Sequence, residues 1–120
     1  MLVIDAANVI GSQPTGWWRD RPGAARTFTQ RVRASVLAGG LSGPVTIVLE
    51  GQARAGAEEA DVGGVTVVHA AGEGDDTIAA LAAANHDVVV VTADRGLATR
   101  VRAVDGTVVG PHWLLDQLVG

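Results

Sequence analysis

The chain begins MLVIDAANVI over residues 1–10, and this stretch sets the expectation for the whole fold. Its apolar run, Leu2-Val3-Ile4, has the length of a strand and no polar alternation, which is typical of a strand buried on both faces of a parallel sheet. Asp5 follows directly, where such a strand would end. Ligands of open α/β sheets bind at the carboxyl ends of the strands. The first ten residues therefore predict a buried strand that places a carboxylate at a ligand-binding edge.

The rest of the chain alternates strand-like and helix-like segments. Short β-branched runs bounded by Gly, Pro, Asn or Asp occupy residues 45–49, 65–68, 88–91 and, more weakly, 107–109. Helical periodicity appears after Asp20 until Gly39-Gly40, over residues 74–85, after Asp94 and over residues 113–118. This alternation predicts an α/β fold, a three-layer α/β/α sandwich with a parallel sheet, as one domain over residues 1–120. Residues 51–64 are expected to form a loop or a short irregular connection.

The composition excludes several classes of protein. With 120 residues and 48% apolar composition, the chain can cover one core and is not a disordered tail. The absence of Cys excludes disulfide scaffolds, zinc knuckles and thiol catalysis, so any metal must be held by oxygen or His. All nine basic residues are Arg, and the net charge of −4 argues against a uniformly basic nucleic-acid binder. No apolar run is long enough for a membrane span or a signal peptide, so we expect a soluble cytoplasmic protein without membrane contact.

Carboxylates follow the predicted strands at what should be one edge of the sheet: Asp5, Glu50, Asp75, Asp76 and Asp94. Each of them alone is explained as a helix cap or a solvated loop charge. Capping, however, does not require acids on adjacent strands. If the first, second and fourth strands are neighbours, three carboxylates meet in one cleft and repel each other. A hard divalent cation, Mg²⁺ or Mn²⁺, would relieve that repulsion.

Three short motifs lie at these strand ends: DAANVI over residues 5–10, GDDTIAA over residues 74–80 and TADRGL over residues 92–97. In their order and placement they resemble the PIN-like nucleases, specifically the NYN group, and the similarity extends from residue 2 to about residue 110. The resemblance implies a sheet of strand order 3-2-1-4-5. It also implies a divalent-metal-dependent ribonuclease that hydrolyses phosphodiester bonds of single-stranded RNA, and we expect an endonuclease in preference to an exonuclease.

By motif match, Asp5 would be a direct metal ligand, and Asn8 would orient the metal, a water molecule or a phosphate. Asp94 completes the set, with the Thr92 hydroxyl supporting a metal ligand. Glu50 stands where NYN proteins often carry Asp, and its longer side chain leaves open whether it contacts the metal directly.

Asp75 or Asp76 would supply an acid from a helix. Adjacent helical residues point about 100° apart, so the two acids should not play equal parts. Asp75 shares a face with Ile78 and is expected against the sheet, while Asp76 is expected further into the cleft. The predicted metal ligands are thus Asp5, Glu50, Asp75, Asp76 and Asp94, and the predicted catalytic residues are Asp5, Asn8, Asp76 and Asp94.

Residues 17–33 carry five arginines and one aspartate, a local charge of +4 that begins with Trp17-Trp18. Arginines beside exposed aromatic rings suit single-stranded nucleic acid, because they contact phosphates while the rings stack on bases. We expect Trp17 or Trp18, but not both, to contact RNA, and Arg19 and Arg21 to contact phosphates in preference to Arg31 and Arg33, which lie farther along the helix. The alternative is that one tryptophan closes the core and the arginines solvate a helix face.

Arg95 directly follows Asp94, so it either meets the scissile phosphate or pairs with its acidic neighbours. The three histidines receive no role in the site.

Two other functions stay open from the sequence. One is a catalytically inactive PIN-like module that binds RNA or protein, which fewer than four acids meeting at one point would favour. The other is a toxin-like nuclease silenced by an inhibitory or targeting protein partner. The oligomeric state and the preference for RNA over DNA are also open.

Overall fold

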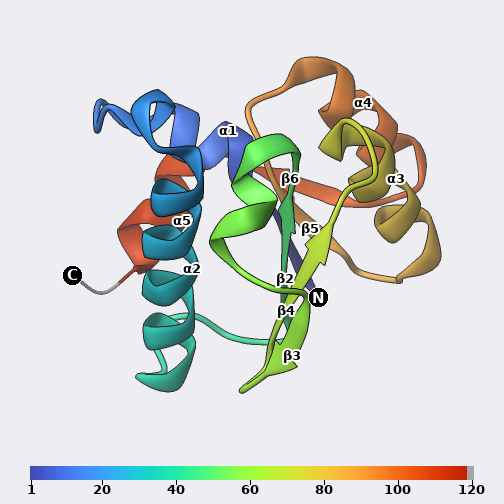
Figure 1. Ribbon diagram of the computed structural model, residues 1–120. Coiled ribbons are helices and arrows are strands. Elements are labelled where there is room, and N and C mark those ends of the chain that lie inside the picture. Colours follow the sequence, from blue (N-terminus) through green and yellow to red (C-terminus); the bar gives the residue numbers. More distant parts are fainter. Residues whose placement is uncertain (119–120) are drawn as a thin grey trace.

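The computed structural model describes residues 1–118, which build one sheet between two layers of helices (Figure 1). The strands are β1 (Leu2–Asp5), β2 (Val45–Leu49), β3 (Ala60–Val62), β4 (Val65–His69), β5 (Val89–Val91) and β6 (Thr107–Val109). Across the sheet they follow the order β3-β4-β2-β1-β5-β6. The pairs β4-β2, β2-β1, β1-β5 and β5-β6 are parallel. Counted along the chain, the parallel strands therefore have the predicted order 3-2-1-4-5, which is confirmed.

The helices are α1 (Ala6–Gly11), α2 (Arg21–Leu37), α3 (Gly74–Ala84), α4 (Arg95–Ala103) and α5 (Pro111–Gln117). Two 3-10 helices, η1 (Trp17–Arg19) and η2 (Gly51–Gly56), precede α2 and follow β2. Figure 1 shows α2 and α5 on one side of the sheet and α3 and α4 on the other, which confirms the three-layer architecture.

Both faces of the central strands are buried, and neighbouring residues of one strand belong to different cores. Ile4 packs in the cluster that contains Phe28 of α2 and Leu114 of α5. Val3 packs in the cluster that contains Ile78 of α3 and Leu97 of α4. This double coverage explains why the strand sequences show apolar runs in place of alternation.

The segment of residues 51–64 differs from the expected irregular connection, because it contains η2 and the edge strand β3. β3 pairs antiparallel with β4, and the turn between them is Gly63-Gly64, both at positive φ. The Gly-Gly dipeptide is a hairpin signal. The strand itself was not predicted because Ala and Asp are weak strand formers.

The short helix α1 was also not predicted. It has six residues and starts where β1 ends, so it is too short to show a helical period. Its first turn is stabilised by Asp5, whose carboxylate accepts a 3.4 Å hydrogen bond from the backbone N–H of Asn8. The residue predicted as a ligand thus also begins a helix.

The strands β2, β1 and β5 are neighbours and end at the same level. Asp5 lies opposite Val48 in β2, and Ile4 lies opposite Val91 in β5. Asp5, Glu50 and Thr92 therefore stand at one edge of the sheet, where these strands end.

Candidate active site

Asp5 is the most buried acid of this edge, with 5% of its surface exposed. Its Oδ2 accepts a 2.9 Å hydrogen bond from the hydroxyl of Thr92. The pKa of Asp5 is raised to about 6, chiefly by burial; the hydrogen bonds from Thr92 and Asn8 lower it, and the negative charges of Asp75 and Glu50 act in the same direction as burial. A carboxylate in this environment is uncompensated when ionised, so it favours a proton or a cation nearby.

Thr92 links Asp5 to the start of α4. Its buried hydroxyl donates to Asp5 and accepts a 3.1 Å hydrogen bond from the backbone N–H of Asp94. The carboxylate of Asp94 in turn accepts from the N–H of Leu97 at 2.9 Å and caps α4. The predicted supporting role of the Thr92 hydroxyl agrees with this geometry. The expected cap at Asp94 is confirmed, and the cap uses one of its two oxygens, Oδ1.

Asn8 fixes α1 to the loop between β5 and α4. Its Oδ1 accepts a 2.7 Å hydrogen bond from the backbone N–H of Ala93. Together with the Thr92 hydrogen bonds, this contact holds the end of β1 against the segment that carries Asp94. The side-chain oxygen of Asn8 is therefore engaged, and only its amide nitrogen remains to face a ligand.

Glu50 and Asp75 approach the same edge from β2 and α3. Glu50 accepts a 3.2 Å hydrogen bond from the N–H of Gly74, the first residue of α3. A Cβ at Gly74 would lie 3.2 Å from Oε1 of Glu50, so the contact requires a residue without a side chain or a shift of Glu50. Partial burial raises the pKa of Asp75, and the charges of Asp94, Glu50 and Glu73 act in the same direction against that of Arg100. Asp75 is thus the helix-borne acid that faces the other carboxylates.

Asp76 lies apart from this group. Its carboxylate forms a 2.9 Å ion pair with Arg100 of α4, and its side chain is 86% exposed. The structure therefore reverses the expected orientation of the two acids: Asp75 faces the acids and Asp76 faces Arg100. The reason is the direction of α3, which is fixed by Glu50 at Gly74 and by Ile78 in the core.

The five predicted ligands do not form a closed cage. Among residues 1–118, no three His, Asp or Glu side chains lie close enough together to hold a metal ion by themselves. The prediction that Asp5, Glu50, Asp75, Asp76 and Asp94 converge tightly is therefore wrong as a single set, because Asp76 pairs with Arg100, while Glu50 and Asp94 bind helix N-termini. The chemistry still fits a hard divalent cation, since the donors are carboxylate oxygens and since burial, together with the charges of neighbouring acids, raises the pKa of Asp5 and Asp75.

The two tryptophans of η1 have different surroundings. Trp17 is half-buried and packs against the core, whereas Trp18 is 55% exposed. Their rings meet edge to face at 5.8 Å. The guanidinium of Arg19 lies 5.7 Å from the ring centre of Trp18, and that of Arg21 lies 5.5 Å from the ring centre of Trp17. The structure thus separates a tryptophan that closes the core from one that faces solvent.

A hollow of about 320 Å³ extends from this segment to the acidic edge. It is lined by Trp17 and Arg21 on one side and by Glu50 and Gln52 on the other. The basic segment and one of the acids therefore border the same space. Arg95, the exposed first residue of α4, directly follows Asp94 and has no ion pair among the described residues.

His69 has structural partners. Its Nε2 lies 2.7 Å from the carbonyl oxygen of Ala57, and its backbone N–H donates to Glu59. These contacts attach β4 to the segment before β3, in agreement with the absence of a site role for this residue.

No helix within residues 1–118 combines the length and the apolar character needed to cross a membrane.

Comparison with known proteins rests on structure. No protein-family model matches the chain, and no curated protein matches it in sequence. Among solved structures, the chain is similar to Rae1 (YacP) from Bacillus subtilis, seen in the crystal structure of a variant, with a TM-score of 0.70. The similarity covers 97% of this chain and 72% of that chain at 20% sequence identity. At this identity the similarity shows the fold: the mostly parallel six-stranded sheet flanked by helices is the PIN-like fold of Rae1.

Proposed function

We propose that this protein is a divalent-metal-dependent endoribonuclease that hydrolyses phosphodiester bonds of single-stranded RNA. The observation that carries the proposal is that the Thr92 hydroxyl joins the carboxylate of Asp5 to the backbone N–H of Asp94 at the carboxyl edge of a PIN-like sheet. The raised pKa of Asp5 supports it, because Asp75 and Glu50 contribute negative charge at the same place.

In this proposal one or two of the carboxylates of Asp5, Asp75 and Asp94 bind Mg²⁺ or Mn²⁺ directly, and water molecules link the rest to the ion. Mg²⁺ is commonly held by one or two carboxylates together with waters and substrate phosphates, so the open arrangement of acids suits it. When bound, such an ion activates water near neutral pH and stabilises the leaving oxygen of a phosphodiester. Glu50 acts by positioning α3 through Gly74, and Asp76 is left out of the set because of its ion pair with Arg100.

The neighbouring polar groups have distinct tasks. Asn8, whose oxygen is held by Ala93, presents its amide nitrogen toward a phosphate oxygen or a water molecule. Arg21 and Arg95 contact phosphates of the strand on either side of the acids. Trp18, with Arg19 beside its ring, offers an exposed face on which a base stacks.

Cleavage of circular single-stranded RNA tests the proposal, because only an endonuclease can open a circle. The wild-type protein should cut it with Mg²⁺ or Mn²⁺ and stop in excess chelator. Asp5→Asn and Asp94→Asn should abolish cleavage while Asp116→Asn on α5 retains it. Full activity of either active-site variant, or in chelator, refutes the proposal.

One observation favours a second candidate, an RNA-binding module without catalysis: no three acids of residues 1–118 form a ready metal cage. Such a module would bind RNA in chelator and as the Asp5→Asn variant, would leave circular RNA intact under all metal conditions, and would lose affinity with rising salt. Cleavage by the wild-type protein that depends on Asp5 excludes it.

A further inference from the structure

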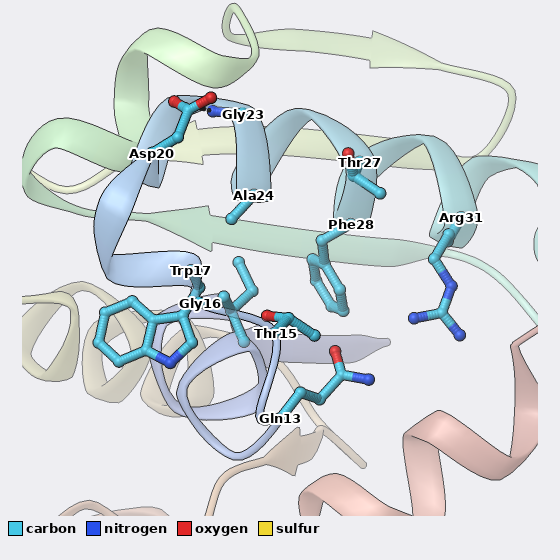
Figure 2. A pocket seen from close by; sticks show the side chains of 11 residues that line it. Gln13, Thr15, Gly16, Trp17, Asp20, Gly23, Ala24, Thr27, Phe28 and Arg31 are labelled. Atoms are coloured by element: carbon cyan, nitrogen blue, oxygen red, sulfur yellow. Dashed lines mark hydrogen bonds between the residues drawn. The ribbon is translucent and has the colours of Figure 1, made fainter.

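A second hollow, of about 310 Å³, lies between α2 and the turn that follows α1 (Figure 2). We refer to it as the α1–α2 hollow. Its wall contains Gln13, Thr15, Trp17, Thr27, Phe28 and Arg31. Figure 2 shows Asp20 and Trp17 toward one end of it and Arg31 at the other. Apart from Trp17 and Arg31, these residues carry no sequence signal of a binding site, because they come from separate segments of the chain.

The inner wall of the hollow is apolar and aromatic. Phe28 is 3% exposed and Ile10 is buried, and both belong to the core that Trp17 and Ala24 cover. Such a surface is suited to the face of a flat ring. An apolar wall with a few polar groups around it is the usual composition of a small-ligand site.

Several polar side chains around this wall have no hydrogen-bond partner within residues 1–118. The side chains of Gln13, Thr15 and Thr27 form no hydrogen bond within residues 1–118. The Nε of Arg31 is buried and also has no hydrogen-bond partner. The Nε of Arg33, outside the hollow, is likewise buried and unpaired, so this atom alone does not mark a ligand; the side chain of Arg31 lines the hollow and brings its positive charge there.

The two ends of the hollow carry opposite charges, Asp20 at one end and Arg31 at the other (Figure 2). At one end the carboxylate of Asp20 is occupied by the N–H of Gly23 at 2.9 Å, and it repels anions. At the other end Arg31 attracts them. A ligand with a flat ring and an acidic group would therefore place the ring against Trp17 and the acidic group at Arg31.

Trp17 connects this hollow to the acidic edge. Trp17, Ile10 and Ala24 line both the α1–α2 hollow and the hollow that reaches Arg21 and Glu50. Trp17 is thus a wall shared by two neighbouring spaces of similar volume. A strand that runs over the acids has a direct path across Trp17 into the α1–α2 hollow.

From this arrangement we infer that the α1–α2 hollow binds one nucleotide of the RNA strand, with its base against Trp17 and its phosphate at Arg31. The inference rests on the proposed function for the choice of RNA. It adds a binding site for a single nucleotide that is remote from the acids. The bound nucleotide would lie at a fixed distance along the RNA from the cleaved bond.

Binding of short single-stranded RNA oligonucleotides in chelator tests the inference without any cleavage. In a series of oligonucleotides that each lack one base, the loss at one position should weaken binding to the wild-type protein about tenfold, as expected for one stacked base. Thr27→Leu fills the hollow from the exposed face of α2 and should weaken binding of the intact oligonucleotide to a similar degree. It should have little effect on the oligonucleotide that lacks the critical base. Gln30→Leu, on the same helix but outside the hollow, is the matched control.

The contact of Arg31 with a phosphate is tested by a second pair of variants. Arg31→Gln should weaken RNA binding and reduce its salt dependence by about one phosphate contact, whereas Arg102→Gln on α4 removes the same charge without that effect. Thermal unfolding of each variant shows whether the fold is intact. If Thr27→Leu and Arg31→Gln bind RNA like their controls, or if no single base matters, the inference is wrong.

Further measurements distinguish a free nucleotide from RNA as the ligand of the hollow. They also distinguish failure of the hollow from failure of the proposed nuclease. Each nucleoside 5′-monophosphate is titrated while the indole N–H signal of Trp17 is followed by NMR. In one outcome, a free monophosphate binds saturably to the wild-type protein and not to Thr27→Leu, while RNA binds equally to both. This combination assigns the hollow to free nucleotides and overturns the RNA assignment. Base-dependent, Thr27-sensitive RNA binding by a protein that never cleaves RNA supports the hollow and refutes only the nuclease. Asp5-dependent cleavage that is indifferent to Thr27 and Arg31 refutes only the hollow.

Discussion

The hydroxyl of Thr92 donates a 2.9 Å hydrogen bond to the carboxylate of Asp5, although 87 positions separate the two residues in the chain. The contact exists because β1 and β5 are parallel neighbours that end at the same level. It joins the most buried acid of the edge to the backbone of Asp94 through one oxygen atom. The hydrogen bond therefore lowers the pKa of Asp5, against the effect of burial, and links Asp5 to the start of α4.

Replacing Thr92 by Val removes the hydroxyl at nearly constant volume. The variant leaves Asp5 without its donor and the N–H of Asp94 without its acceptor, so the free energy of unfolding should fall by about 1–3 kcal/mol. The pKa of Asp5 should rise, because the Thr92 hydrogen bond lowers it in the wild-type protein. Chemical denaturation and NMR titration of the Asp5 carboxyl measure the two effects. Thr92→Ser, which keeps the hydroxyl, should restore both, and a fully stable Thr92→Val would contradict the assigned role.

The stability of the protein should depend on pH through Asp5. Its pKa is about 6 in the folded chain against a reference value of 3.8, so between these values the folded chain binds more protons than the unfolded chain. The free energy of unfolding should therefore fall as pH rises from about 4 to about 6, by on the order of 3 kcal/mol for this group alone. Asp5→Asn should remove this slope. Urea denaturation in chelator across this range checks it, and equal slopes in the wild-type protein and Asp5→Asn would disprove the role of Asp5.

The two acids of α3 should differ in activity. Asp75→Asn removes a carboxylate that faces Asp94 and Glu50, and we expect cleavage of RNA to fall about 10- to 100-fold, a loss typical of disturbed metal sites. Asp76→Asn removes a surface ion pair with Arg100 and should leave cleavage nearly unchanged. Initial rates at saturating Mn²⁺ compare the two variants. A larger loss of cleavage activity in Asp76→Asn than in Asp75→Asn would contradict this assignment and support the orientation expected from the sequence.

Trp17 and Trp18 should differ in their contribution to stability. Trp18→Ala removes an exposed ring and should weaken RNA binding about 5- to 100-fold, equivalent to about 1–3 kcal/mol for a stacked base, with little change in the melting temperature. Trp17→Ala removes a half-buried ring from the core and should lower the free energy of unfolding by about 2 kcal/mol. Fluorescence anisotropy with labelled RNA and thermal unfolding measure the two quantities. RNA binding by Trp18→Ala equal to that of the wild-type protein would remove Trp18 from the interface.

Local sequence determined most of the architecture. The β-branched runs predicted the five parallel strands, since a strand buried on both faces needs apolar residues at every position. Asp20 and Asp94 marked the starts of α2 and α4 because a cap is a contact between residues three apart. The strand β3 and the helix α1 were not predicted, since each is too short for a periodic pattern.

The tertiary structure decided which of the predicted residues act together. The sequence placed the acids at one edge of the sheet because parallel strands end on the same side. It did not determine that Asp75 faces the acids while Asp76 pairs with Arg100, because that depends on the rotation of α3 against the sheet. It also did not determine that Trp17 packs on the core while Trp18 faces solvent, or that Gln13, Thr27 and Arg31 border one hollow. Contacts between distant segments depend on how helices pack, and packing is set by the whole core and not by any local pattern.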